Sequence, residues 1–315
     1  MNTVSSSAKQ VTLDYLTGES SDGRLHPLYD VPSNLKRRKI TARVFEHLFK
    51  FSTYGLIAIL LYLIGDVLAD GWKWLSLEFL DNFASRYPSR SGIKAALFGS
   101  LWLISLTALF SIPVGVAAGI YLEELMAKSR LNKFITLNIQ NLAGVPSIVY
   151  GILGLGLFVR FFNFDRSILS GALTLALLIL PIIIIATREA LKAIPNTIRH
   201  AALSLGATKW QAVRSHVLPA ALPSILTGVI LSVSRAIGET APLIVVGAVA
   251  YIRFTPETVM DSYTALPIQI YNWVGKPKAE FHELAAAGII VLLAVLLITN
   301  SIAILIRNSR QRINI

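Results

Sequence analysis

This sequence contains a series of long apolar segments, several of which are long enough to cross a lipid bilayer. Of its 315 residues, 54% are hydrophobic and only 15% are charged. Because unpaired backbone groups are costly in lipid, such segments are expected to be helical. The sequence therefore predicts an all-α polytopic membrane protein with six transmembrane helices. The predicted spans are 51–69, 95–122, 134–159, 168–187, 221–250 and 284–306.

The basic residues are distributed unevenly over this predicted topology. The formal net charge is +11, and 19 of the 29 lysine and arginine residues fall on the side that carries both termini. The opposite loops hold 9, and Arg235 lies inside a predicted span. By the positive-inside rule, both termini and the segment 188–219 are expected to be cytoplasmic. This distribution argues against nucleic acid as a partner and makes membrane lipid the expected surroundings.

The first 35 residues differ in composition from the rest of the chain. They are polar, with serine-rich stretches, and contain no apolar core of the kind found in a signal peptide. Residues 1–35 are therefore predicted to be a disordered cytoplasmic tail, and 36–315 to be the membrane domain. A regulatory tail and an inert tether both remain open. The chain has no cysteine, which excludes disulfides.

Motifs for ATP binding or hydrolytic chemistry are absent from the sequence. Gly275 and Lys276 are followed by Pro277, so they do not complete a phosphate-binding loop. The metalloprotease and serine hydrolase motifs are also missing, and the five histidines are scattered. We expect no catalytic residue, no metal and no cofactor, and a membrane enzyme is the less favoured class.

The segment 188–219, between the fourth and fifth predicted spans, is too charged to cross a membrane. Its apolar residues recur at helical spacing, and Gly206 and Pro219 are expected to delimit two short helices separated by a bend. A segment of this kind could offer a firm protrusion to a partner protein.

Polar residues inside the predicted membrane region concentrate in the fifth span. Arg235 lies near the middle of 221–250, where a charged side chain costs about 2.5 to 3.5 kcal/mol. Glu239 follows four residues later, and Ser232 and Thr240 add hydroxyl groups. If the span is one helix, a single stripe of small, polar or charged residues faces a bundle interior or a pore. The stripe consists of Gly228, Ser232, Arg235, Glu239 and Pro242.

The stripe suggests a path for an oxyanion. An arginine presents fixed donors that match phosphate or sulfate and stays charged at physiological pH. A carboxylate such as Glu239 can accept a hydrogen bond from a protonated phosphate but repels fully ionised sulfate. We therefore expect Glu239 to favour phosphate over sulfate. A purely structural interpretation stays open, in which Arg235 and Glu239 only neutralise each other.

The block 201–243 resembles a known family. It closely resembles the cytoplasmic coupling loop and following helix of type I ABC importer permeases, and the stretch SRAIGETAPL is similar to the PstA-type subunit of phosphate transporters. His200 stands where the coupling motif has glutamate, so this position departs from the family's pattern. The candidate coupling residues are His200, Ala201, Ala202, Gly206, Ala207, Leu218 and Pro219.

This resemblance implies a MetI-like permease fold, a location in a bacterial inner membrane and a larger assembly. It implies a homologous PstC-like sister permease, a PstB-like cytoplasmic ATPase dimer that binds the ATP, and a PstS-like phosphate-binding protein. Arg235, Glu239, Ser232 and Thr240 would line the substrate path. Two alternatives stay open, a permease for phosphonate, sulfate or molybdate, and a secondary anion transporter.

Overall fold

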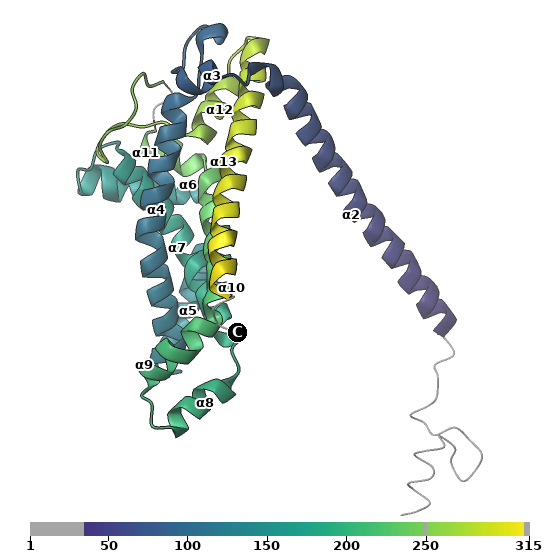
Figure 1. Ribbon diagram of the computed structural model, residues 1–315, viewed down its shortest axis with the longest axis vertical. Coiled ribbons are helices and arrows are strands. Elements are labelled where there is room, and N and C mark those ends of the chain that lie inside the picture. Colours follow the sequence, from purple (N-terminus) through teal and green to yellow (C-terminus); the bar gives the residue numbers. More distant parts are fainter. Residues whose placement is uncertain (1–34, 249–250, 312–315) are drawn as a thin grey trace, which may run out of the picture. The chain divides into compact units, whose positions relative to one another are not determined.

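The computed structural model describes residues 35–248 and 251–311, and all regular secondary structure in these two ranges is helical (Figure 1). The predicted tail 1–35 lies outside the described residues, apart from Leu35. The long helices are α2 (Leu35–Gly71), α4 (Lys94–Ile120), α7 (Ile168–Lys192), α10 (Leu218–Gly238) and α13 (Ala279–Gln311). The short helices are α3 (Leu77–Asp81), α5 (Arg130–Ala143), α6 (Ser147–Gly154), α8 (Asn196–Ser204), α9 (Lys209–Ala212), α11 (Ala241–Val246) and α12 (Leu266–Val274).

Five short 3₁₀ or π-helical segments lie at helix ends or in the connecting loops of the described residues. Two are 3₁₀ turns, η2 (Trp72–Trp74) and η3 (Pro88–Arg90). Three are π-helical, η4 (Tyr121–Leu125), η5 (Leu155–Phe161) and η6 (Val213–Val217). π-Helical turns of this kind often occur near functional sites.

The chain divides into two compact units, Met1–Ile64 and Gly65–Ile315. In the first unit, the described residues form the greater part of α2, which is helical without interruption. In the second unit, α8 and α9 lie at one end of the bundle, and α3 and α12 lie at the other (Figure 1).

The prediction of an all-α membrane protein is confirmed. Among the described residues, 5 helices are long and apolar enough to cross a membrane, or up to 6 if one bent pair counts as a span. Four of the predicted spans lie within single long helical segments. These are 51–69, 95–122, 168–187 and 284–306.

The prediction of one continuous helix over 134–159 was wrong. This region forms the bent pair, in which α5 and the helix that follows it meet at 100°. The break falls at Gly144, Val145 and Pro146. Proline cannot donate a helical hydrogen bond and pushes the residue before it away from helical geometry, so a straight helix is interrupted there.

The fifth predicted span, 221–250, was also wrong as one helix. A continuous helical path runs over Lys209–Gly238 and ends at Glu239, whose φ of −74° and ψ of 125° are extended. The short helix α11 follows and ends at Gly247 in a left-handed conformation. Pro219 does not end a short helix as expected, because it occupies the first turn of α10, where its missing N–H is tolerated.

Close contacts between α4 and α7 form the centre of the second unit. A Cβ atom on Gly115 would lie 2.7 Å from Ile183, and one on Gly119 would lie 2.6 Å from Thr187. Small residues at this spacing let two membrane helices approach closely. The Gly115 and Gly119 pair therefore makes a contact within this subunit.

Part of the segment before α13 packs into the protein. Tyr263 and Trp273 are fully buried, and the buried hydroxyl of Ser100 accepts a hydrogen bond from the Leu266 N–H at 2.8 Å. The carbonyls of Val259 and Asp261 accept hydrogen bonds from the first N–H groups of α7. This segment therefore caps one end of the bundle.

Candidate functional site

The segment between α7 and α10 forms a compact protrusion. Helix α8 ends before Gly206, whose φ of +84° reverses the chain direction, and α9 begins after Thr208. Thr208 and Gln211 form a reciprocal capping box that satisfies the first N–H groups of α9. The expected bend at Gly206 is confirmed, but the second helix continues through η6 into α10.

The predicted coupling residues fall into two groups. Ala202 is buried and its carbonyl accepts a hydrogen bond from the Ala207 N–H at 3.2 Å, which closes the turn. His200 and Ala201 are exposed on α8. Leu218 and Pro219 are half-buried where the helix enters the bundle. The buried and half-buried residues therefore hold the protrusion in place. The exposed residues, His200 and Ala201, are accessible to a partner.

The protrusion exposes several large apolar side chains. Leu205 is 89% exposed and Trp210 is 48% exposed, and Ile198 and Leu203 on α8 are also exposed. Large apolar side chains that gather on an exposed segment often mark a contact surface. We call Ile198, Leu203, Leu205 and Trp210 the coupling face.

A pair of charged residues anchors α8 to the bundle. The Arg199 guanidinium donates to the Glu124 carboxylate, with 3.1 Å between Nε and Oε2, and to the carbonyls of Ile194 and Leu191 at 2.7 and 2.8 Å. The hydrogen bond to Glu124 raises the pKa of Arg199 above its usual value. Arg199, one residue before His200, therefore provides a charged anchor for this helix.

A second pair lies beside the first. The Arg188 guanidinium on α7 binds Glu123 through two nitrogens, at 3.1 and 3.0 Å from Oε2, and also donates to the Thr136 hydroxyl on α5. Arg188 is buried within the chain. The two neighbouring acids of η4 thus connect α4 to α7, α5 and α8 at the end of the bundle that carries the protrusion.

Reasoning from the sequence missed Glu123, Glu124 and Thr136. The only available signal was the adjacent pair of acids near the end of an apolar span, in a chain with few acids. The separations from Arg188 and Arg199 are 65 and 75 residues, so no local spacing relates them.

The polar residues of the fifth span gather where α10 ends. Arg235 lies in the last turn of α10, about 5 Å from its end at 1.5 Å per residue, rather than near the middle of a longer helix. Its Nε lies 3.2 Å from Glu239 Oε1, and the two side chains are 50% and 15% exposed. Glu239, the residue at which α10 ends, therefore forms an ion pair with Arg235 in the last turn of that helix.

The two hydroxyl residues of this site are placed differently. Ser232 is buried, and its hydroxyl donates to the Gly228 carbonyl of its own helix at 2.8 Å. Thr240 is half-buried in the break itself, where its hydroxyl lies 3.5 Å from the Gly238 carbonyl. Because Glu239 is not helical, the five residues from Gly228 to Pro242 do not form one continuous helical stripe as predicted.

The two broken helices meet each other. A Cβ on Gly151 of α6 would lie 2.7 Å from the Pro242 Cα of α11, so the two short helices cross at backbone contact. Val145 and Tyr150 near the first break share one apolar cluster with Val233 and Ala236 near the second. Broken helices expose backbone polar groups inside a membrane only where protein or a cavity surrounds them, which is typical of transport sites.

Residues 111–315, which include both breaks and the protrusion, match the family described as the inner membrane component of binding-protein-dependent transport systems. This chain belongs to that family. It is a multi-pass permease component of an ABC importer, and members of the family are not themselves catalytic.

The similar curated proteins are bacterial permeases. A probable ABC transporter permease of Bacillus subtilis, YqgI, is 34% identical over 207 residues, which are 66% of this chain and 70% of the relative. The phosphate transport system permease protein PstA of Pasteurella multocida is 32% identical over 266 residues, 84% of this chain and 94% of the relative. PstA 1 of Mycobacterium tuberculosis is 29% identical over 284 residues, 88% and 92% respectively. The chain is thus a permease of PstA type.

Solved structures share the fold. An inward-facing MetNI methionine ABC transporter matches with a TM-score of 0.56 at 19% identity. The match covers 67% of this chain and 94% of the transporter chain. A bacterial importer of the acidic polysaccharide alginate has a TM-score of 0.61 at 16% identity, with 87% and 98% covered. The predicted MetI-like permease fold is therefore confirmed.

Proposed function

We propose that this permease carries inorganic phosphate inward across the bacterial cytoplasmic membrane. In this proposal both termini face the cytoplasm, and a homologous sister permease of PstC type completes the path. A dimeric ATPase of PstB type binds and hydrolyses the ATP, and an extracytoplasmic protein of PstS type delivers the phosphate. The PstA relatives support the choice of phosphate.

The observation that carries the proposal is the pair of Arg235 and Glu239 at the helix break. Half of the Arg235 side chain is exposed on this chain, so some of its donors remain accessible although Nε faces Glu239. A guanidinium with accessible N–H groups can bind a phosphate oxygen through charge-assisted hydrogen bonds. Arg235 is therefore proposed to bind phosphate during its passage through the permease. Thr240, in the same helix break, is proposed as a further contact.

Glu239 is proposed to provide selectivity. At neutral pH phosphate retains a P–OH group that can donate to a carboxylate, whereas sulfate has none. A sulfate ion beside Glu239 would meet repulsion without a compensating hydrogen bond, which lowers its affinity relative to phosphate. Ser232, which is buried in this chain, would take part only after a rearrangement of α10.

Coupling is proposed to act through the protrusion. The coupling face would fit a groove on the ATPase, and closure of the ATPase would push α8. The Arg199 to Glu124 pair joins α8 to the end of α4, and α9 continues through η6 into α10. A displacement of α8 would thereby reach both the α4 to α7 core and the helix that carries Arg235.

The test is uptake into proteoliposomes that hold this permease together with a sister permease of PstC type and an ATPase of PstB type. We expect ATP-dependent, binding-protein-dependent uptake of radioactive phosphate, with little uptake of sulfate. Glu239→Gln is expected to narrow the preference for phosphate over sulfate. Uptake that needs no ATPase and follows an ion gradient would instead identify a secondary transporter, and a wild-type preference for phosphonate, sulfate or molybdate would identify another oxyanion as cargo.

A further inference from the structure

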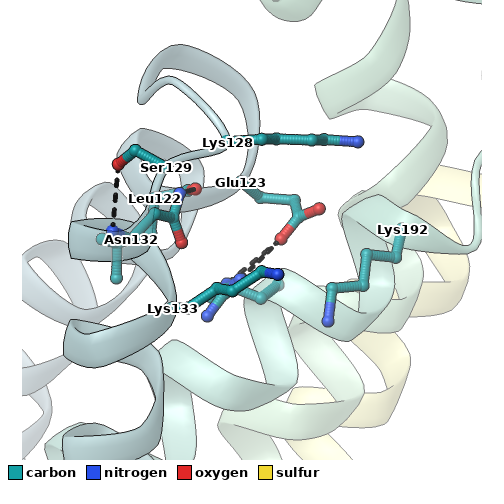
Figure 2. A pocket seen from close by; sticks show the side chains of 8 residues that line it. Leu122, Glu123, Lys128, Ser129, Asn132, Lys133 and Lys192 are labelled. Carbon is teal, nitrogen blue, oxygen red and sulfur yellow. Dashed lines mark hydrogen bonds and ion pairs between the residues drawn. The ribbon is translucent and has the colours of Figure 1, made fainter.

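A cavity of about 180 Å³ lies at the end of the bundle that carries the protrusion. It is lined by η4, by the residues that lead into α5, by the start of α5 and by the end of α7. Figure 2 shows Lys128, Lys133 and Lys192 around the Glu123 carboxylate. The residues that line the cavity are Leu122, Glu123, Lys128, Ser129, Asn132, Lys133, Arg188 and Lys192.

The charge of this cavity is strongly positive. Arg188 neutralises Glu123 through the two hydrogen bonds described above, and Lys192 shares an ion pair with Glu189 at 2.7 Å. Within the described part of the chain, neither Lys128 nor Lys133 has a carboxylate within ion-pair distance. Two ammonium groups therefore line a cavity whose single acid is already paired, which suits an anion.

The frame of the cavity is rigid. The Asn132 side chain is buried and donates to the Leu122 carbonyl at 2.8 Å, and its carbonyl oxygen accepts from Thr136. The hydroxyl of Ser129 caps α5 by accepting from the Asn132 N–H. Hydrogen bonds within the chain thus hold the Lys128 to Lys133 segment in place, and the two lysines project from a fixed support.

The position of the cavity favours lipid as the source of the anion. It lies where two membrane-length segments, Lys94–Leu125 and Ile168–Lys192, both end. Leu131 and Phe134, next to its lysines on α5, are exposed apolar side chains. A phosphodiester headgroup in the cavity would leave its acyl chains beside such residues, and basic pockets between membrane helices bind anionic headgroups in this way.

We propose that this cavity binds the phosphate group of an anionic phospholipid, with Lys128 and Lys133 as its principal ligands. The lipid occupies the junction of α4, α5 and α7 and stabilises the same region to which Arg199 attaches α8. This site is separate from the transport path at Arg235 and does not depend on which anion is transported.

The experiment is native mass spectrometry of the purified full-length chain, titrated with phosphatidylglycerol or phosphatidylcholine. We expect a clear preference for phosphatidylglycerol, and about a fivefold loss of its affinity for each of Lys128→Gln and Lys133→Gln. Arg130→Gln is the matched control, because this exposed arginine lies between the two lysines in sequence but does not line the cavity. It is expected to retain the preference. Size-exclusion chromatography checks that each variant is folded.

Three outcomes would overturn the proposal. Equal binding of both lipids by the wild type would show that no anionic headgroup is recognised. A loss with Arg130→Gln as large as with the lysine variants would indicate diffuse attraction to the surface. Displacement of phosphatidylglycerol by millimolar inorganic phosphate, in a parallel titration, would assign the cavity to a soluble anion instead of a lipid.

Discussion

Arg199 on α8 and Glu124 on η4, 75 residues apart in the sequence, form an ion pair that is largely shielded from solvent, with side chains 18% and 7% exposed. The pair joins the end of a membrane helix to the protrusion that carries the coupling face. The guanidinium also binds two carbonyls at the end of α7. One arginine therefore fixes three segments relative to one another.

Replacing Glu124 by Gln is expected to destabilise the protein by about 2 kcal/mol, between the values for exposed and for fully buried pairs. It leaves the arginine charge without its counterion. The protrusion should loosen, so ATP-driven uptake should fall as well. Tryptophan fluorescence during thermal unfolding measures the first effect and proteoliposome uptake the second. Glu189→Gln is the control, because its ion pair with Lys192 is exposed. Unchanged stability and uptake in both variants would mean that the Glu124 pair contributes nothing.

Replacing Arg235 by Lys tests the transport path. Lysine keeps the charge but lacks the planar fork of donors that matches an oxyanion, so we expect phosphate uptake to fall roughly tenfold. Protein stability should change little. Arg90→Lys serves as the control, because Arg90 lies on η3 and is not one of the proposed path residues. Wild-type uptake by Arg235→Lys would favour the structural interpretation, in which the residue only balances the charge of Glu239.

Replacing Gly151 by Ala tests the crossing of the two broken helices. The new methyl group would lie 2.7 Å from the Pro242 Cα and 2.9 Å from the Pro242 carbonyl oxygen, and backbone atoms cannot move aside easily. We expect a loss of about 1 to 3 kcal/mol in stability. Gly156→Ala, nearby in η5, has open space around its Cβ and should be tolerated. The comparison of their unfolding midpoints decides whether the close approach matters.

Replacing Gly206 by Ala tests the turn of the protrusion. Space around the Cβ is open, so any effect comes from the φ of +84°, which costs an alanine about 1 to 2 kcal/mol. Hydrogen exchange at the amides of α8 and α9 should become faster. Gly206→Asn should have a smaller effect, because asparagine tolerates the left-handed region better. Identical exchange in all three proteins would contradict a strained turn.

The stability of the loop that caps α7 should depend on pH, because the Asp261 carboxylate holds this loop together. Its carboxylate accepts hydrogen bonds from the Thr258 and Glu257 N–H groups, both at 2.9 Å, and these lower its pKa below the usual value. Because the pKa is lowered in the folded state, the stabilisation is present above the ordinary pKa of 3.8 and is lost as the pH falls through the folded pKa.

Hydrogen exchange of those two amides measures this effect. Protection, corrected for intrinsic exchange, should be constant near neutral pH and should fall on acidification below pH 4. Asp261→Asn keeps one acceptor oxygen but cannot ionise, so its protection should be weaker and independent of pH in that range. A pH profile shared by both proteins would exclude Asp261 as the titrating group.

The helical class, the positions of the apolar segments and the bend at Gly206 could be predicted from the sequence alone. These depend on local properties, namely a run of apolar residues long enough for a bilayer and a glycine at which the backbone can reverse. It also pointed to the family, because the coupling segment and the SRAIGETAPL stretch are contiguous in the chain. His200 in place of glutamate raised a doubt about the anchor that the sequence could not resolve.

Which residues come into contact follows from the way the helices pack in three dimensions. The third and fifth apolar segments are each long enough for one helix, yet they break at Pro146 and Glu239, where α6 and α11 pack against each other. The pairs of Glu123 with Arg188 and Glu124 with Arg199 join residues far apart in sequence. Such pairings result from the packing of helices already formed, and neither the spacing nor the hydrophobic pattern within one segment contains that information.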